Sequence, residues 1–355
     1  MKKLFFVLIS CMAFFIIVDA GLRVFLFFKN RDAQYLKFHV GVAHVTPHQL
    51  KLEGSFKNYK GYYKFTPGKF GFERNTYYPY TINSLGFRGP EFSVKKAPGV
   101  VRVCVFGGST TFGHGVEDGE TYVYYLDKIL NETGGVGRFE VINCGFPSYR
   151  MEHIYNLFSE EVVNYEPDAI VVYSAWNDAF MSGIVSGKSM LWRLHNLLYY
   201  RWMLYTLILE KYSSAKHGSA LPFFYRHGKI PGDYVRYLDM IIRAAEGRGI
   251  NIFLVEQPCN MPEAGIPGGL GPGQLRKLYA GTTDMSKAGV IAQRYYLKQM
   301  KLLGERRGAY VIDPLYEIER RPELFLDTVH LNAQGNRMLA HIIAKEIIES
   351  QAHGN

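Results

Sequence analysis

The sequence predicts an α/β fold in which a parallel sheet of five strands lies between two layers of helices. From residue 100 onward, short apolar runs recur without polar alternation, which is typical of strands buried on both faces. Helical stretches follow these runs, and repeated strand–helix alternation indicates a doubly wound parallel sheet. The chain has 355 residues, 48% of them apolar and 21% charged, so it can bury the core that such a sheet needs.

The first 28 residues are expected to form a transmembrane helix. Their apolar run is interrupted only by Asp19 and Arg23, and about 20 apolar residues suffice to cross a bilayer. The run is longer than a signal-peptide core and ends in no clean cleavage site, so we expect an uncleaved single-pass anchor. The remaining chain is then expected at the cell membrane, outside the cytoplasm. Lys29 and Arg31 nearly balance the two lysines before the run, so charge alone does not set the orientation.

Residues 29–98, which we call the preamble, are expected to form short strands and turns. The preamble contains five prolines and many aromatic residues that alternate with polar ones. Between positions 29 and 74, nine Lys or Arg stand against three Asp or Glu, within a chain of formal net charge +9. No nucleic-acid-reading module accompanies these charges, so no nucleic-acid partner is expected. An anionic lipid surface, an acidic polymer and a solvated linker all fit the pattern.

The main domain is expected over residues 99–355. Its strands are expected at residues 101–106, 139–143, 169–174, 250–255 and 309–313. Its helices are expected at residues 120–132, 151–165, 233–247, 292–307 and 332–349. Two insertions interrupt the alternation, at about 183–232 and 258–290. The first holds an apolar helix candidate at 189–210, which fits a lid, a second membrane-contacting helix or an extra packed helix. The second is rich in Gly and Pro and is expected to be a long loop.

No metal and no cofactor are expected. Four cysteines in a chain of this length do not make a disulfide framework, and we expect all of them to be free: Cys11, Cys104, Cys144 and Cys259. Three histidines have no metal-binding spacing and are expected to be structural: His114, His153 and His195. The stretch GGSTTFGHG also lacks the lysine of a phosphate-binding loop.

The chemistry is expected where the first strand ends, in VFGGSTTFGHGV (residues 105–116). Parallel sheets carry their sites at the carboxyl ends of strands, and Ser109 stands there after two glycines. A serine hydroxyl needs a base to take its proton, and the base needs a third group to orient it. In FLDTVHLNAQGNRML, Asp327 precedes His330 by three residues, so its carboxylate can fix the imidazole tautomer. Ser109, His330 and Asp327 are the expected nucleophile, base and orienting carboxylate.

Three donors are expected to stabilise an oxyanion, one at each of three strand ends. They are the backbone N–H of Ser109, the N–H of Gly145 in INCGFPSY, and the side-chain amide of Asn177 in VYSAWNDAF. Other interpretations stay open for two of them: Gly145 fits a turn that needs positive φ, and Asn177 fits a helix cap. For the neighbouring Asp178, a cap of the following segment is the preferred interpretation.

These four blocks resemble those of the SGNH (GDSL-type) hydrolase superfamily over roughly residues 100–350. The blocks GGST, NCG, AWND and DTVH occur in the family's order, each at the end of a predicted strand or just before the last helix. Two departures are Gly108, where the family often has aspartate, and Ala175, where it has glycine. The resemblance implies a flavodoxin-like three-layer sandwich and an esterase or acyl-transfer activity. Within this resemblance, the segment INSLGFRGPEF (residues 82–92) looks like the preamble of membrane-tethered bacterial envelope members of the family.

We therefore expect a serine esterase that removes acyl groups, O-acetyl in particular, from an envelope or extracellular carbohydrate. The sugar preference rests on the aromatic residues, the basic preamble and the family's envelope members. Two alternatives stay open. An O-acetyltransferase would use the same triad with a membrane acyltransferase as acyl donor, and a non-catalytic scaffold would serve a polysaccharide-export machine. The four intact blocks argue against the scaffold.

Overall fold

The computed structural model describes most of the main domain and parts of the preamble. The described residues are 13, 14, 17, 18, 21, 56–58, 63–65, 68–70, 80–133, 138–181, 230, 232–261, 266, 269–282 and 285–352. Residues 51–183 and 227–355 form one compact unit, which contains the sheet and the site. Almost all of the expected anchor lies outside the described residues, as do the apolar segment 189–210, Cys11 and His195. Within the described part of the chain, no helix is long and apolar enough to cross a membrane.

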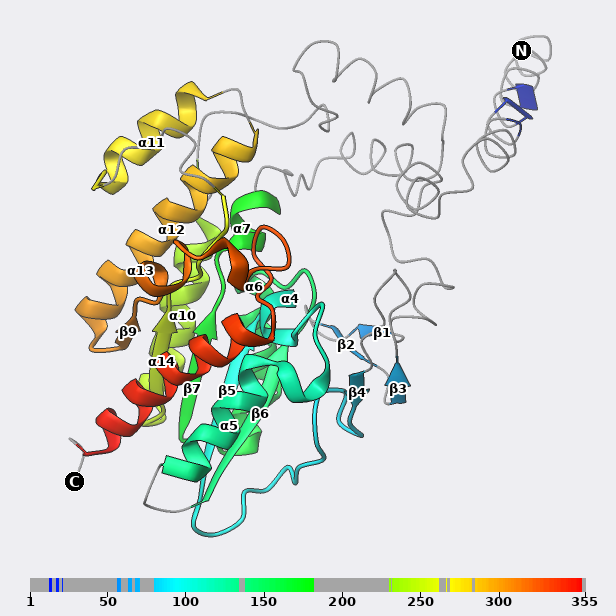
Figure 1. Ribbon diagram of the computed structural model, residues 1–355, viewed down its shortest axis with the longest axis vertical. Coiled ribbons are helices and arrows are strands. Elements are labelled where there is room, and N and C mark those ends of the chain that lie inside the picture. The colour runs from blue at the N-terminus through cyan, green and yellow to red at the C-terminus, as the bar shows by residue number, and fades with distance from the viewer. Residues whose placement is uncertain are drawn as a thin grey trace, which may run out of the picture. The chain divides into compact units, whose positions relative to one another are not determined.

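Five parallel strands form the central sheet, in the order β6-β5-β7-β8-β9 (Figure 1). The prediction of a five-stranded parallel sheet is confirmed. The sheet begins with β5, and the chain then adds β6 on one side and β7 on the other, so the order reverses at the end of β5. Such a switch point opens a crevice beyond the carboxyl ends of the strands. The strands are Val100–Gly107 (β5), Arg138–Gly145 (β6), Ala169–Tyr173 (β7), Asn251–Val255 (β8) and Tyr310–Ile312 (β9).

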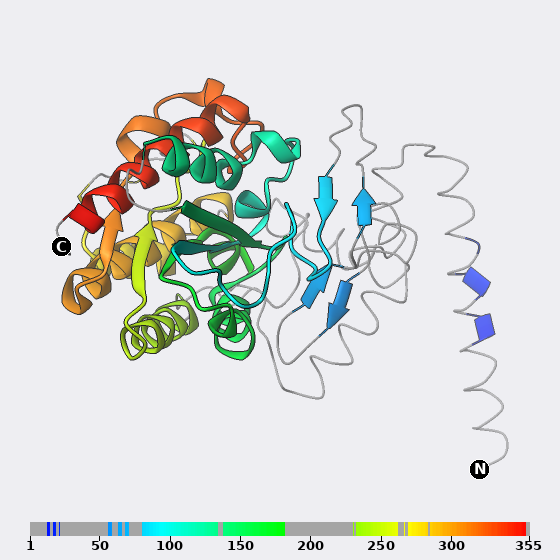
Figure 2. The same ribbon diagram turned by 90° about the horizontal axis from the view of Figure 1, so that it is seen from below.

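Helices cover both faces of this sheet (Figures 1 and 2). One face carries α5 (Tyr122–Thr133) and α14 (Ala333–Ala352), and the other carries α6 (Met151–Glu160), α10 (Asp233–Glu246) and α12 (Met285–Arg307). Alternate strand residues such as Val103 and Val105 pack against α5 and α14. Cys104 and Phe106, which alternate with them along β5, are fully buried as well. Burial on both faces explains why the strands are apolar throughout.

Shorter elements connect the layers and shape the loops. They are α4 (Ser109–Phe112), η1 (Asp118–Glu120), η2 (Val162–Tyr165), α7 (Trp176–Met181), α13 (Leu315–Ile318) and η3 (Pro322–Leu324). Three cysteines, Cys104, Cys144 and Cys259, are buried free thiols, as expected.

The expectation of a long loop over residues 258–290 is wrong for much of its length. Helix α11 covers Pro272–Gly281, and α12 already begins at Met285. Pro272 stands at the first helical turn, where its missing N–H costs nothing and its fixed φ favours the helix. Leu275 and Tyr279, four residues apart, are both buried. This spacing and Pro272 are the helical signals that the many glycines and prolines obscure.

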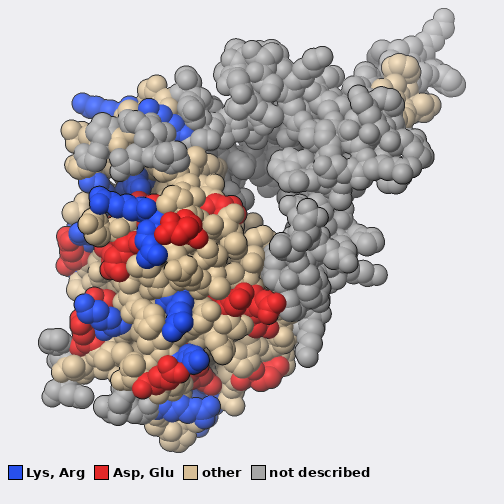
Figure 3. Space-filling view, viewed as in Figure 1, with Lys and Arg blue, Asp and Glu red and all other residues tan. Residues whose placement is uncertain are grey.

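The preamble forms short strands, as its sequence predicts. β1 (Phe56–Asn58) pairs with β2 (Tyr63–Phe65), and β3 (Gly68–Phe70) pairs with β4 (Tyr80–Ile82), both antiparallel. Beyond β4, Arg88 forms an isolated bridge with Asn143 of β6, so this end of the preamble joins the main sheet. On the described face in Figure 3, acidic and basic side chains are interspersed.

Candidate active site

The nucleophile candidate stands at the first position of α4, and only Gly108 separates it from β5. The two glycines before it are required by close approach rather than by a left-handed turn. A Cβ on Gly107 would lie 2.0 Å from Thr111 Oγ1, and a Cβ on Gly108 would lie 2.6 Å from Asn177 Nδ2. Gly108 has a φ of −89°, which other residues adopt readily. Because Ser109 opens the helix, its N–H has no acceptor within α4 and can face a ligand.

The structure brings together the three residues of the predicted triad. His330 Nε2 lies 2.8 Å from Ser109 Oγ, and His330 Nδ1 lies 2.7 Å from Asp327 Oδ2. Asp327 Oδ1 also accepts the backbone N–H groups of Val329 and His330, at 2.9 Å each. These bonds assign the Nδ1 proton to the side facing Asp327, which leaves Nε2 free to accept the serine proton.

Asp327 is held in its ionised form. Partial burial alone would raise its pKa, but the hydrogen bond and charge of His330 and the two backbone N–H donors outweigh burial. The pKa of Asp327 therefore lies well below its usual range. A permanently ionised carboxylate is what an orienting group for an imidazole base requires.

Asn177 lies on α7 beside the nucleophile. Its Nδ2 donates one hydrogen bond to Tyr149 O at 2.9 Å, and the amide group has a second N–H to offer. A small pocket of about 10 Å³ opens here, lined by Gly108, Ser109, Thr110, Ser174, Trp176, Asn177, Gln257 and Val329. The donating side chain and the serine thus border one space. Ser148, which immediately precedes Tyr149, has a φ of 63°, an uncommon conformation for a residue other than glycine.

The structure contradicts the expected oxyanion role of Gly145. Its N–H donates to Asn143 Oδ1 at 3.0 Å, and the residue is buried beneath α4. The alternative of a turn with positive φ is wrong too, because Gly145 is not among the described residues with positive φ. A Cβ at this position would lie 2.4 Å from the backbone nitrogen of Phe112. Gly145 is therefore a glycine because α4 packs directly against it.

Two buried amides position the site, and neither is assigned a role from the sequence, although Asn143 begins the block NCG. Asn143 Nδ2 donates to Thr111 O at 3.0 Å, which ties α4 to the end of β6. Gln257 Oε1 accepts the N–H groups of Ala175 and Trp176, both at 2.9 Å, and its Nε2 donates to Thr110 Oγ1 at 3.2 Å. The only sequence signal for either residue is a polar side chain at the end of an apolar strand.

Asp178 is a cap, but of a different helix from the one expected. Its carboxylate accepts the N–H of Met151, the first residue of α6, at 3.0 Å. Burial raises the pKa of Asp178 to about 7, against the lowering effect of the Met151 N–H. His153 also serves the start of α6, since its Nδ1 accepts the N–H of Arg150 at 3.2 Å. Burial lowers the pKa of His153 to about 4, so it is neutral and structural.

A larger cavity of about 700 Å³ lies between the end of the preamble, helix α5 and strand β6. Ser109, Asp327 and His330 are not among the residues that line it. The larger space is therefore distinct from the pocket at the serine.

Comparison with known proteins matches most of the main domain to one family. The model of the GDSL-like lipase/acylhydrolase family matches residues 105–338. No curated protein matches the chain. Among solved structures, an acetyl xylan esterase (AlAXEase) is 18% identical, covering 68% of this chain and 98% of its own, with a TM-score of 0.43. A catalytic mutant of an acetylxylan esterase from Geobacillus stearothermophilus is 15% identical, with coverages of 70% and 94% and a TM-score of 0.44. A lipase/acylhydrolase from Enterococcus faecalis is 17% identical, with coverages of 70% and 96% and a TM-score of 0.40.

Proposed function

The chain belongs to the GDSL-like lipase/acylhydrolase family and is an SGNH-type hydrolase of ester bonds, and from this premise we propose that Ser109, His330 and Asp327 are its catalytic triad. The observation that carries the proposal is the unbroken chain of hydrogen bonds from Ser109 Oγ through His330 to Asp327. A nucleophile within reach of a base that a third group orients is the arrangement that activates a serine.

The reaction proceeds in two halves. Ser109 Oγ attacks the ester carbonyl carbon while His330 Nε2 takes the hydroxyl proton. His330 then gives this proton to the leaving alcohol as the tetrahedral intermediate collapses to an acyl-serine. In the second half, His330 deprotonates a water that attacks the acyl-serine, and the acid leaves as Ser109 regains its proton. Asp327 stabilises the imidazolium that forms in each half.

We propose that two donors hold the oxyanion, the backbone N–H of Ser109 and the side-chain amide of Asn177. Both groups border the small pocket, and the Tyr149 carbonyl fixes the amide orientation. Donors that are held before charge develops stabilise it without reorganisation. Gly145 takes no part, because its N–H is already bonded.

The substrate we propose is an O-acetyl ester of an envelope or extracellular carbohydrate. The described pocket at Ser109 is small, which favours a short acyl group such as acetyl. The high aromatic share of the chain, 15%, supports a sugar partner.

Acyl-enzyme capture tests this proposal directly. An activated acetyl ester should acetylate Ser109, seen as a mass shift on its peptide, and the Ser109→Ala variant should show none. Adding an acetylated oligosaccharide should release free acetate. Transfer of the acetyl group to an oligosaccharide acceptor in place of water would identify a transferase. No serine-dependent acylation with any acyl donor would refute the enzymatic role.

We further propose that residues 1–28 remain attached and hold the domain at the outer side of a membrane. The length and composition of the apolar run support this. Mass analysis of the mature N-terminus checks it, because a chain that starts near residue 21 would exclude a retained anchor.

A further inference from the structure

The loop after the nucleophile contacts the catalytic imidazole. We call residues 112–116 the nucleophile loop. The ring of His114 lies 5.0 Å from the ring of His330 between centroids, inclined by 51°. The backbone N–H of His114 donates to Ser109 O at 3.0 Å. His330 thus has Asp327 at Nδ1, Ser109 at Nε2 and the His114 ring beside it.

The backbone on both sides of His114 is unusual. Gly113 and Gly115 each have a φ of 92°, a conformation that is open to glycine and strained for other residues. A Cβ on Gly115 would lie 2.5 Å from Leu326 Cδ1, so the loop also packs against the residue before Asp327. Two glycines in so short a loop give it conformational freedom that something else must restrain.

Arg88 of the preamble supplies that restraint. Its guanidinium donates to three carbonyls of the nucleophile loop, to Phe112 O at 3.1 Å, Gly113 O at 2.7 Å and Val116 O at 2.8 Å. Its Nε donates to Asp118 Oδ1 at 2.8 Å. The Arg88 side chain is only 1% exposed. A planar, buried guanidinium with four such bonds fixes the loop in one conformation.

We infer that Arg88 is a positioning residue for the catalytic base, acting through the nucleophile loop and the ring of His114 on the orientation of His330. The inference rests on the proposed function of the triad. Asp327 holds one nitrogen of the imidazole, and this leaves the ring free to rotate about that hydrogen bond. The His114 ring limits this rotation, so that Nε2 stays directed at Ser109 Oγ. The preamble, which lies ahead of the family match at residues 105–338, thereby contributes to the geometry of the site.

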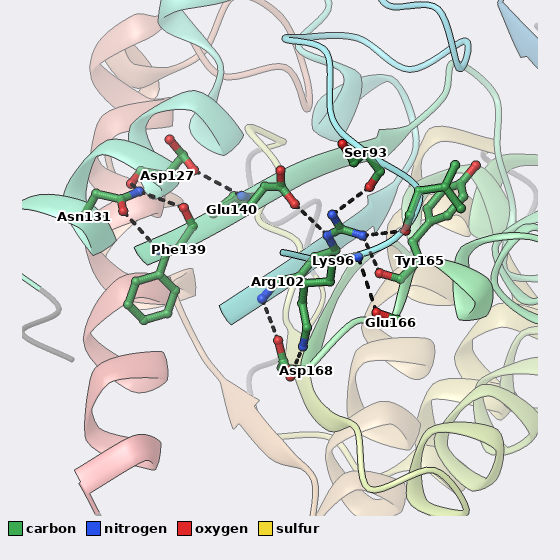
Figure 4. A network of polar contacts seen from close by, with 12 residues as sticks. Ser93, Lys96, Arg102, Asp127, Asn131, Phe139, Glu140, Tyr165, Glu166 and Asp168 are labelled. Atoms are coloured by element: carbon green, nitrogen blue, oxygen red, sulfur yellow. Dashed lines mark hydrogen bonds and ion pairs between the residues drawn. The ribbon is translucent and has the colours of Figure 1, made fainter. Parts of the chain in front are cut away.

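The chain contains a closely matched control in Arg102. This arginine is also 1% exposed, and its guanidinium donates to the carbonyls of Ser93, Val94 and Tyr165 and to the Glu140 carboxylate (Figure 4). It belongs to β5 near the strand's amino end, opposite the end that carries the serine. Arg88 and Arg102 are therefore equally buried, and each donates to three carbonyls and one carboxylate. They differ in their position, because only Arg88 bonds to the nucleophile loop.

The test is a double-mutant cycle on the full chain, with kcat, KM and the melting temperature measured for each variant. Arg88→Lys keeps the charge but cannot reproduce the planar fork. We expect Arg88→Lys and His114→Ala each to lower kcat by about 10- to 100-fold with little change in KM, as misplacement of a reacting group does. The double variant should lose little more than either single one, because both changes release the same contact. His114→Phe should keep most of kcat, since a ring remains against His330.

Arg102→Lys should lower the melting temperature as Arg88→Lys does while leaving kcat unchanged. Losses in kcat that multiply in the double variant would overturn the inference, because Arg88 would then act by a route other than His114. An equal loss of kcat in Arg102→Lys would also overturn it, by reducing the effect to general destabilisation. Both outcomes presuppose that Ser109→Ala abolishes turnover. If Ser109→Ala stays active, the proposed function itself fails.

Discussion

Replacing Asn177 by alanine should separate catalysis from stability more sharply than any other single change in the site. The amide makes one ground-state hydrogen bond, to Tyr149 O, and such a bond contributes about 1 kcal/mol to folding. Asn177 also borders the pocket beside Ser109, where charge develops only as the tetrahedral intermediate forms. Loss of one oxyanion donor typically lowers kcat by about 10²- to 10³-fold, or roughly 3 to 4 kcal/mol. We therefore expect a large fall in kcat, a nearly constant KM and a small fall in melting temperature.

The assay measures kcat and KM with an activated acetyl ester, together with thermal unfolding, for Asn177→Ala and for its neighbour Asp178→Ala. The Asp178 carboxylate accepts the Met151 N–H and is buried, so its loss leaves an unpaired buried donor. That variant should lose about 1 to 3 kcal/mol of folding free energy and keep most of kcat. If Asp178→Ala carries the kinetic loss and Asn177→Ala only the thermal one, the assignment of the oxyanion donor is wrong by one residue.

The sheet could be predicted because its physical signals are local. A strand buried on both faces must be apolar throughout, and the expected run 101–106 lies inside the observed β5, Val100–Gly107. The meeting of residues that are distant in the sequence could also be predicted, because the carboxyl ends of parallel strands lie at one edge of the sheet. Ser109, Asn177 and the loop with Asp327 and His330 are predicted to meet there, and the structure places them together.

The error at Gly145 has a different physical origin. Whether a backbone N–H is available depends on which side chain reaches it, and here Asn143, two residues earlier, accepts it. Nothing in the pattern NCG reveals this bond. The role of Arg88 could not be predicted from the sequence, for a related reason. Its three carbonyl partners lie more than 20 residues along the chain, and a carbonyl acceptor leaves no mark on the sequence.

Three further predictions concern the triad and one buried carboxyl group. Ser109→Ala and His330→Ala should each abolish turnover about as completely as the double change, because the two act as one unit, and independent losses that multiply in kcat would contradict the triad. Asp327→Asn should lower kcat by about 10⁴-fold, as expected when the wrong imidazole tautomer is held, and a loss below about tenfold would count against an orienting role. Glu256→Gln should change the pH dependence of folding. Burial, followed by the charge of Asp313, raises the pKa of Glu256 from 4.5 to about 7. The folded protein therefore keeps this proton at pH values where the unfolded chain has released it, and the associated stability is lost as the pH rises from about 4.5 through 7. Glutamine cannot ionise, so the variant should gain free energy of unfolding relative to the parent by up to about 3 kcal/mol between about pH 5 and about pH 8. Urea unfolding at these two pH values measures the difference, and a difference that does not change with pH would show that Glu256 is ionised in the folded protein at an ordinary pKa.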